Sequence, residues 1–337
     1  MIPNYWYAII EANKVKQKPV SISRMGEDLV LWRNAQGNVI CMIDRCPHRG
    51  AALSLGRVKN NCIECPYHGF QYDTKGQCTL MPCKGKKARI PPGFEVKVFP
   101  VRETQGFIWI WWGEERLDVA YRPEERSPLP EPPRFKQLDT NLAHTAEASQ
   151  VWNVNYARIM ENNLDIHHLP FVHRSVTPGV GTRIDPYHVE TEGDLITTWG
   201  QLRQDDGKSA EESPGWFFRI TVIFPQLSLI ELSPKVRLLV IVTPIDENNS
   251  WVAIRYYQDY VKIPLLGRLL AWLILMVEFK IFQERQDLPV LRSLKPKQAD
   301  LKSNKFVAAD AGSAQYLKRH EYLLKVSSKL GIRSSEL

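Results

Sequence analysis

Two short stretches share one pattern, Cys46-Pro47-His48-Arg49-Gly50 and Cys65-Pro66-Tyr67-His68-Gly69-Phe70. In each stretch a proline directly follows the cysteine, and a glycine lies beyond the histidine. Proline fixes φ, and glycine adopts backbone conformations that residues with a Cβ resist, so both stretches are expected to form tight loops. Both loops carry side chains that bind metals, which predicts that together they hold one metal centre.

The metal-binding residues of the two loops are Cys46, His48, Cys65 and His68. Their types limit which metals or clusters the loops could bind. Thiolates favour iron–sulfur clusters or zinc, and replacing two thiolates of one iron by neutral imidazoles raises the reduction potential of the cluster. Zinc is the alternative, because Cys62 also forms Cys-x-x-Cys with Cys65 and zinc sites often mix cysteine with histidine. Two matched Cys-Pro loops are much rarer than one Cys-x-x-Cys, which favours the cluster.

The two loops resemble those of a Rieske [2Fe-2S] domain. The resemblance implies that their two cysteines and two histidines hold the cluster. The other cysteines are then expected to be small, buried or half-buried residues with free thiols. These are Cys41, Cys62, Cys78 and Cys83.

With 337 residues, the chain is long enough for two domains. The first third of the chain has short apolar runs between turn signals, for example 28–32 and 107–112, which predicts an all-β domain. Five prolines between residues 122 and 133 exclude a regular helix or a central strand there. We therefore predict a Rieske domain at 1–118, a proline-rich linker at 119–135 and a catalytic domain at 136–337. Within the last segment, strands are expected around 216–222 and 237–242 and a helix at about 265–287.

A second candidate site lies between Asp165 and His173. Asp165 and His168 are three residues apart and would share a helix face, whereas His168 and His173 would point about 140° apart on an unbroken helix. Pro170 disfavours helix at Leu169, so a turn there would bring His173 back to a metal that His168 holds. Two imidazoles and one carboxylate on one face of a ferrous ion leave positions open for O₂.

The second site resembles the Asp-x-x-His-x4-His motif of the Rieske non-haem iron oxygenases, and residues 152–155 are similar to the family's lead-in to it. The resemblance now covers both predicted domains. It implies a role for each of four residues: His168 and His173 as iron ligands, Asp165 as the acid that links this iron to a neighbouring chain's cluster through His68, and Asn162 as a residue near the iron.

The family's third iron ligand is an aspartate on a C-terminal helix. Gln286-Asp287-Leu288-Pro289 resembles that segment and favours Asp287, with Glu278 and Glu284 as competing carboxylates. His167 adjoins His168 and could in principle coordinate instead. The spacing from Asp165 and to His173 selects His168, which leaves His167 to support or pack against the site.

The resemblance implies an α+β fold in which the all-β Rieske domain precedes a helix-grip-like domain with an antiparallel sheet and flanking helices. It also implies a terminal oxygenase that assembles as a head-to-tail homotrimer. Such an enzyme uses O₂ and electrons from NAD(P)H, delivered by a separate flavin reductase, a ferredoxin or both. In this chain Gly179-Val180-Gly181 lacks the third glycine and the context of a dinucleotide fingerprint.

The chain is most similar to homotrimeric members of the family that hydroxylate or oxidatively demethylate hydrophobic aromatic or multi-ring compounds. Aromatic residues near the expected pocket, Phe171 and 216–218, suit such a guest, although core packing explains them equally well. The alternatives are an aromatic-ring cis-dihydroxylating dioxygenase, a Rieske electron-transfer protein without oxygenase activity, and a zinc-stabilised binding module. A further domain with a His/His/Asp set argues against the last two.

The formal net charge is +7, but no nucleic-acid recognition motif accompanies it. Ten basic and four acidic residues lie between residues 41 and 100, and a positive face there would attract an acidic ferredoxin. An ordinary solvated surface explains these charges equally well. The N-terminus has no evident signal or transit peptide, so we expect a cytoplasmic protein with reduced cysteines.

The apolar run 269–277 is too short to span a bilayer, which needs about twenty residues. It is expected to be a buried helix of the catalytic domain. Alternatively, an exposed side of this helix would admit a lipophilic substrate or touch a membrane surface.

Overall fold

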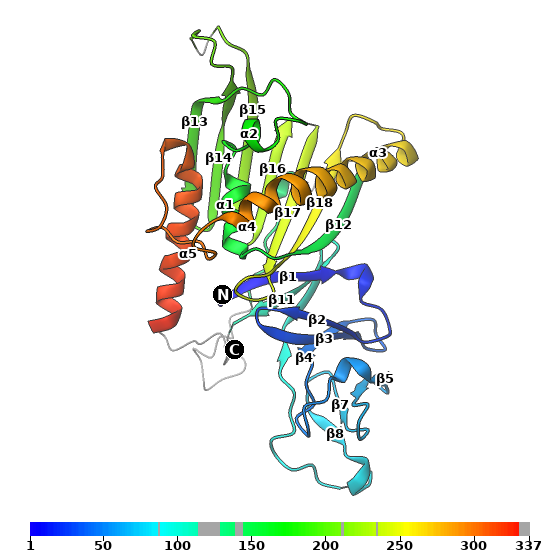
Figure 1. Ribbon diagram of the computed structural model, residues 1–337. Coiled ribbons are helices and arrows are strands. Elements are labelled where there is room, and N and C mark those ends of the chain that lie inside the picture. Colours follow the sequence, from blue (N-terminus) through cyan, green and yellow to red (C-terminus); the bar gives the residue numbers. More distant parts are fainter. Residues whose placement is uncertain (87, 114–128, 139–143, 210–211, 234, 330–337) are drawn as a thin grey trace. The chain divides into compact units, whose positions relative to one another are not determined.

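The computed structural model describes residues 1–86, 88–113, 129–138, 144–209, 212–233 and 235–329. The chain divides into two compact units, one made mainly of residues 3–132 and the other mainly of residues 133–331 (Figure 1). Much of the linker predicted at 119–135 lies outside the described residues, so its limits and those of the flanking domains stay predictions.

The described part of the first unit is built from short strands and single 3₁₀ turns. Its strands are β1 (Tyr5–Glu11), β2 (Val20–Arg24), β3 (Glu27–Arg33), β4 (Val39–Ile43), β5 (Arg57–Lys59), β6 (Cys62–Glu64), β7 (Gln71–Tyr72), β8 (Cys78–Leu80), β9 (Val98–Phe99), β10 (Val101–Thr104) and β11 (Phe107–Trp112). They form a three-stranded sheet in the order β1-β11-β10 and two four-stranded sheets in the orders β2-β3-β4-β9 and β5-β6-β7-β8.

Strand β11 explains how this small unit holds a core. All six of its residues are buried, and each large apolar side chain taken out of water contributes about 1.5–3 kcal/mol. The strand lies between β1 and β10 and is antiparallel to both. The strands predicted at 28–32 and 107–112 are confirmed as parts of β3 and β11.

The second unit contains one seven-stranded antiparallel sheet in the order β12-β18-β17-β16-β15-β14-β13. Its strands are β12 (His144–Trp152), β13 (Arg183–Glu192), β14 (Leu195–Arg203), β15 (Gly215–Ile223), β16 (Leu227–Ser233), β17 (Val236–Pro244) and β18 (Ser250–Gln258). The predicted strands at 216–222 and 237–242 fall within β15 and β17, and the predicted fold class is confirmed.

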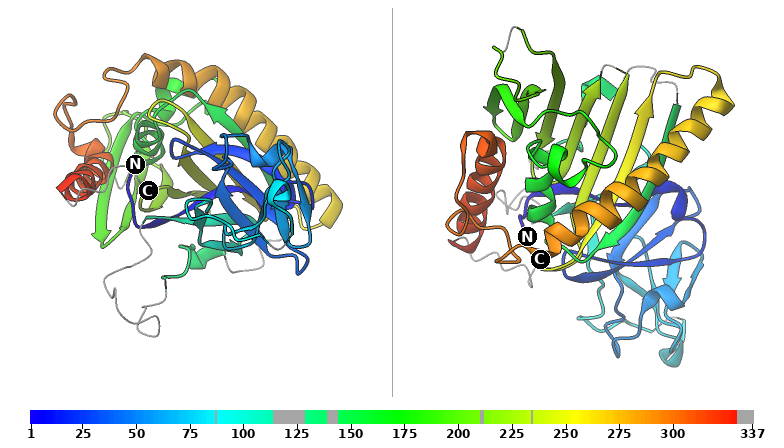
Figure 2. Two further views of the ribbon diagram at one scale, coloured as in Figure 1. Left: turned by 90° about the horizontal axis from the view of Figure 1, so that it is seen from below. Right: turned by 45° about the horizontal axis from the view of Figure 1, so that its top comes forward.

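The second unit also contains helical elements. They are α1 (Tyr156–Leu164), α2 (Leu169–Val172), α3 (Pro264–Val277), a π-helical segment (Glu278–Asp287), α4 (Leu288–Ser293) and α5 (Ala311–Lys329). Figure 2 shows α3 crossing the sheet on the same face as α1. The α3 helix packs against β12 and β18, whereas α1 contacts β15, β16 and β17. The helix predicted at about 265–287 is therefore present, with a π-helical second half.

The apolar run 269–277 lies in α3 and is half buried. Ala271 and Leu275 are buried, whereas Leu269, Trp272 and Leu273 are about half exposed. The expectation of a wholly buried helix is therefore wrong for its outer side, because a helix on a sheet can bury only one stripe of its surface. A role of the exposed side toward substrate or membrane stays a prediction. No helix among the described residues is long and apolar enough to cross a membrane.

Candidate metal centres

The loops that follow Cys46 and Cys65 share the same backbone hydrogen bonds. Gly50 N donates to Cys46 O at 2.8 Å, and Gly69 N donates to Cys65 O at 3.0 Å. Each cysteine N–H donates to the carbonyl five residues further on, at 2.8 Å in both loops. Gly50 and Gly69 have φ of 77° and 71°, in the region that favours glycine. Two equivalent loops therefore present one cysteine and one histidine each, as the sequence predicts.

The cysteines of these loops are buried, and the histidines lie closer to the surface. Cys46 and Cys65 are each 2% exposed, whereas His48 is half-buried and His68 is exposed. The two imidazole rings have their centroids 4.7 Å apart. The Tyr72 hydroxyl lies 3.1 Å from Cys46 Sγ and can donate a hydrogen bond to a thiolate there. The residues fit a cluster with a buried thiolate side and a histidine side near the surface.

The remaining cysteines differ from one another in burial. Cys41 is buried in the core, and Cys62 and Cys78 are half-buried, as expected. Cys83 is exposed, so its predicted burial is wrong. It follows Pro82 in a single 3₁₀ turn, which lies on the surface and contains no buried residue.

Replacing Cys46 by serine is expected to abolish the visible absorption and the electron paramagnetic resonance signal of the cluster, because the buried sulfur donor is lost. Cys83→Ser is the matched control, since this exposed thiol lies outside the two loops, and it should keep both signals. An unchanged content of acid-labile sulfide in Cys46→Ser would contradict the assignment of Cys46.

Helix α1 carries Asn162 and ends next to Asp165. Its first residue follows Asn155, whose side-chain oxygen accepts a hydrogen bond from Ala157 N at 3.0 Å. At the other end Asp165 has extended backbone angles, φ −88° and ψ 104°, so the chain leaves the helix there. The Asp165 side chain therefore does not lie on the surface of α1, and it is placed at the start of the next turn.

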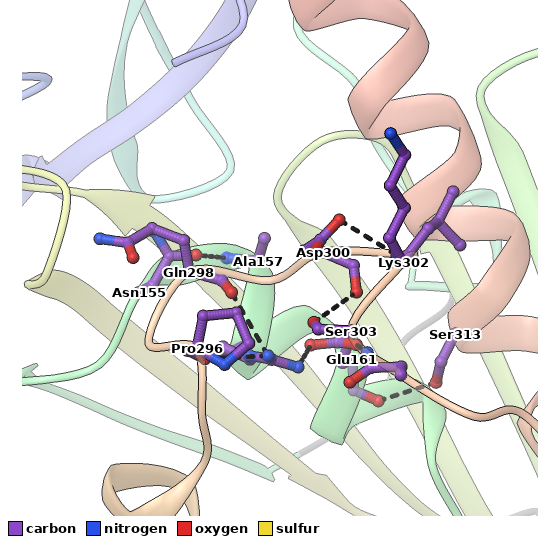
Figure 3. Close-up of polar contacts among 12 residues, drawn as sticks. Asn155, Ala157, Glu161, Pro296, Gln298, Asp300, Lys302, Ser303 and Ser313 are labelled. Carbon is purple, nitrogen blue, oxygen red and sulfur yellow. Dashed lines mark hydrogen bonds and ion pairs between the residues drawn. The ribbon is translucent and has the colours of Figure 1, made fainter.

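Figure 3 shows contacts of α1 with the segment before α5 and with α5 itself. The buried Arg158 guanidinium donates to Glu161 Oε2 at 2.8 Å and to the Pro296 carbonyl at 2.9 Å. Ser313 Oγ donates to the Glu161 carbonyl at 3.1 Å. Arg158 thus connects α1 to the Pro296 carbonyl, and loss of its ion-pair partner Glu161 would leave a buried charge uncompensated.

The single turn of α2 brings His168 and His173 together. Asp165 Oδ1 accepts from His167 N at 2.7 Å and closes a tight turn before α2. His168 immediately precedes α2, and His173 N donates to the Leu169 carbonyl at 3.0 Å. Pro170 lies in the first turn of α2, so the prediction that it breaks a helix is wrong: the break falls at Asp165, and proline starts the next helix.

The π-helical segment supplies Asp287. Pro289, two residues further on, has no N–H to donate to the Arg285 carbonyl and its ring crowds that carbonyl. A widened helix relieves this conflict, and such widenings are frequent at functional sites. In the resulting turn the Asp287 side chain points into the unit, and the residue is only 3% exposed.

His168, His173 and Asp287 converge, with ligand atoms within 4.8 Å of one another. The two Nε2 atoms lie 3.3 Å apart, and Asp287 Oδ1 is 3.3 Å from His173 Nε2 and 3.6 Å from His168 Nε2. Atoms held about 2.1 Å from one ion would lie roughly 3.0–3.4 Å apart. The buried Asp287 Oδ1 also has no hydrogen-bond partner within the described parts of the chain. The three residues fit a mononuclear iron.

Two side chains orient these imidazoles. Gln286 Oε1 lies 2.8 Å from His173 Nδ1, while the Gln286 amide donates to Ser175 Oγ at 2.8 Å. On the other ring, Asp165 Oδ2 faces His168 Nδ1 at 3.6 Å, an ion-pair distance. Both contacts occupy the Nδ1 side and leave Nε2 for a metal. Sequence reasoning gave Gln286 no role, because an amide beside a carboxylate carries no distinctive pattern.

The protonation of these residues depends on burial. Burial raises the pKa of the Asp287 carboxyl to about 6, although the charge of His168 opposes the shift. Burial lowers the pKa of His173 to about 4, so this ring is neutral. Burial also acts to lower the pKa of His168, but Asp165 and Asp287 outweigh it, and the pKa lies above the usual value.

Iron binding is therefore expected to weaken as the pH falls. A metal needs Asp287 ionised and His168 neutral. The apparent affinity should therefore fall by about tenfold per pH unit once the pH is below the raised pKa of His168, and by a further tenfold per unit below about pH 6, where Asp287 also takes up a proton. The measurement is an anaerobic Fe(II) titration of iron-depleted protein that retains its cluster, between about pH 7.5 and pH 5.5. An affinity that stays constant over this range would contradict the ligand assignment.

The other predicted residues are distributed around the site. Asn162 and Glu278 line a cavity of about 210 Å³ next to the three residues, and so do Asp165 and Trp216. Glu284 is exposed and pairs with Lys280 at 2.8 Å, so it does not compete as a ligand. His167 lies outside the His/His/Asp group and packs near Phe171. Phe171 and Phe217 are exposed, and Phe218 is buried next to Tyr187.

Two family models match the chain. A model described as the Rieske [2Fe-2S] domain matches residues 5–100, and one described as the vanillate O-demethylase oxygenase C-terminal domain matches residues 152–326, more than half of the chain. The chain belongs to the Rieske non-haem iron oxygenases. A Rieske oxygenase carries a [2Fe-2S] cluster and a mononuclear iron, so the zinc alternative has no support.

Curated relatives of this Rieske oxygenase include aminopyrrolnitrin oxygenase PrnD from Pseudomonas fluorescens, 32% identical over 50% of this chain and 45% of the relative. The oxygenase component of dicamba O-demethylase from Stenotrophomonas maltophilia is 33% identical over 52% of this chain and 48% of the relative. The chain spans about half the length of the curated relatives it matches.

Solved structures of Rieske oxygenases share the fold over nearly the whole chain. Dicamba monooxygenase bound to dicamba aligns with a TM-score of 0.76 and 22% identity, covering 98% of this chain and 99% of that chain. NdmA of Pseudomonas putida CBB5 with caffeine aligns with a TM-score of 0.71 and 23% identity, covering 98% and 93%. At this identity the likeness concerns the fold alone.

Proposed function

We propose that this chain is the terminal oxygenase component of a multi-component system, which uses O₂ and electrons from NAD(P)H to hydroxylate or oxidatively demethylate a hydrophobic aromatic or multi-ring substrate. The observation that carries the proposal is the convergence of His168, His173 and Asp287 beside a cavity with mostly apolar walls. A ferrous ion bound there would supply O₂ activation, and the cluster would supply single electrons.

Neighbouring residues would hold the metal ligands and the substrate in position. Asp165 and Gln286 would hold the imidazoles with Nε2 toward the metal, as their contacts with the two Nδ1 atoms favour. Apolar side chains from the sheet and from the helical run line the cavity, among them Ile220, Leu238 and Phe282. They would exclude water and orient a ring system for attack.

Electrons would reach the cluster from a ferredoxin, a flavin reductase or both. Exposed basic residues on the Rieske unit, including Arg45, Arg49, Lys84 and Lys86, would attract an acidic donor. The exposed His68 would face Asp165 of a neighbouring chain in a head-to-tail homotrimer, a closed ring of heterologous contacts. We assign the protein to the cytoplasm, where its free cysteines would remain reduced.

The proposal is tested by substrate-stimulated O₂ consumption with a surrogate ferredoxin and reductase, screened over aromatic and multi-ring compounds. His168→Ala should keep the cluster spectrum and lose the stimulated uptake. Equal uptake in both proteins would instead favour an electron-transfer protein. Labelling with ¹⁸O₂ separates the remaining alternative, since a cis-dihydroxylating dioxygenase inserts both oxygen atoms and a monooxygenase inserts one.

A further inference from the structure

The cavity beside the candidate iron site is lined by several acids. Asp165, Glu278 and Asp287 line it, and no lysine or arginine does so among the residues that the structure describes. Asp287 and the two histidines belong to the proposed metal site, whose open positions are needed for O₂. Apart from the metal, whose charge Asp287 already reduces, an anionic guest would therefore find no cation to pair with, which disfavours binding.

Glu278 is separated along the helix from Asp287, one of the proposed ligands. Glu278 is the first residue of the π-helical segment and Asp287 is the last, nine residues further on. Their backbone positions are therefore roughly 10–13 Å apart along the helix axis. Glu278 Oε1 accepts a hydrogen bond from Gln283 Nε2 at 2.6 Å, and both side chains line the cavity. The cavity thus combines a candidate metal site with a separate polar position, while Trp216 and Ile274 contribute apolar wall.

The charge state of Glu278 suits a hydrogen-bond donor. Burial raises the pKa of Glu278 to about 7, with the Gln283 amide opposing the shift and the charge of Asp287 adding to it. Tyr256, which faces Glu278 from β18, stays neutral because burial raises its pKa to about 12. Below neutral pH the cavity therefore presents a carboxylic acid whose O–H can donate to a guest.

We propose that this cavity selects an uncharged ring compound bearing a hydrogen-bond acceptor, and that Glu278 is the specificity-determining residue that donates to that acceptor. The inference rests on the proposed oxygenase function for the fate of the guest, although binding itself requires no turnover. The cavity of about 210 Å³ suits one substituted ring, since a cavity of about 150 Å³ holds benzene.

Three matched probes test the proposal on anaerobic holoprotein by isothermal titration calorimetry near pH 6. They are acetophenone, a neutral acceptor, benzoate, its anionic counterpart, and isopropylbenzene, which has no polar group. We expect the ketone to bind at least about tenfold more tightly than the carboxylate, because the anion finds no lysine or arginine to pair with. Glu278→Leu should weaken ketone binding about tenfold without weakening binding of the hydrocarbon, whereas Glu278→Gln should restore the ketone to within about threefold.

Glu284→Gln is the control, since it removes an exposed carboxylate from the same helical segment and should leave all three affinities unchanged. Cluster absorbance and iron content verify that each variant is folded. Carboxylate binding as tight as ketone binding, an unchanged ketone affinity in Glu278→Leu, or no binding of any probe would overturn the proposal. Failure of the oxygenase function would show separately, as absent O₂ uptake with these affinities intact.

Discussion

Replacing Asp287 by alanine is expected to remove about one iron atom per chain and to leave the cluster in place, because Asp287 contributes a ligand to the mononuclear site only. Product formation should fall by at least about a hundredfold, since even residues that only orient metal ligands change activity by 10–100-fold. Iron analysis and the visible spectrum of the same sample measure both effects.

Two further variants make the Asp287 result specific. Glu284→Ala removes an exposed carboxylate from the same π-helical segment and should keep iron and activity. Asp287→Asn preserves the side-chain volume at this buried position, so iron loss in both Asp287 variants cannot be attributed to a cavity. Full occupancy of the mononuclear iron in Asp287→Ala would rule out Asp287 as a ligand.

Replacing Asp165 by asparagine should leave near-normal amounts of both metals and lower product formation about 10–100-fold. Asp165 is not one of the three converging ligands, but its carboxylate faces His168 Nδ1 and holds the turn before α2. In the proposed trimer it would also connect to His68 of the next chain. The loss should therefore appear in electron transfer, as slower reoxidation of the reduced cluster by O₂ and substrate.

Asp205→Asn is the comparison for this variant, because Asp205 is an exposed aspartate in the loop between β14 and β15. It should reoxidise its cluster at the wild-type rate. Normal turnover in Asp165→Asn would mean that the carboxylate serves only the local turn. Loss of the mononuclear iron would mean that its main task is to hold His168.

The all-β character of the first unit and the strands of the second could be predicted because they depend on local patterns. The two Cys-Pro loops need particular backbone angles, and Gly50 and Gly69 adopt them. Apolar runs such as 107–112 become buried strands. The order of strands in the sheets depends on contacts between distant residues, which these local patterns do not specify.

Proline shows where local reasoning fails. A proline can end one helix or begin another, and at Pro170 the choice depends on the Asp165 side chain, which closes a turn one step earlier. The π-helical geometry of Glu278–Asp287 likewise leaves no periodic signal in the sequence.

The candidate site could be predicted only in part. His168 and His173 are close in sequence, so their convergence follows from a short turn. Asp287 is favoured mainly by the family pattern, since nothing local indicates that it meets residues more than a hundred positions earlier. Glu278, which the sequence leaves open as a competing metal ligand, lines the cavity instead. The contact of Gln286 with His173 depends on the folded structure and cannot be inferred from the sequence.

The central claim is that each chain holds two different iron centres, and Mössbauer spectroscopy of ⁵⁷Fe-enriched, anaerobically reconstituted protein tests it most directly. The account predicts the signals of a Rieske cluster together with a high-spin ferrous doublet worth about one iron per chain, lost in Asp287→Ala. A spectrum with a single kind of iron site and no mononuclear ferrous component would contradict it.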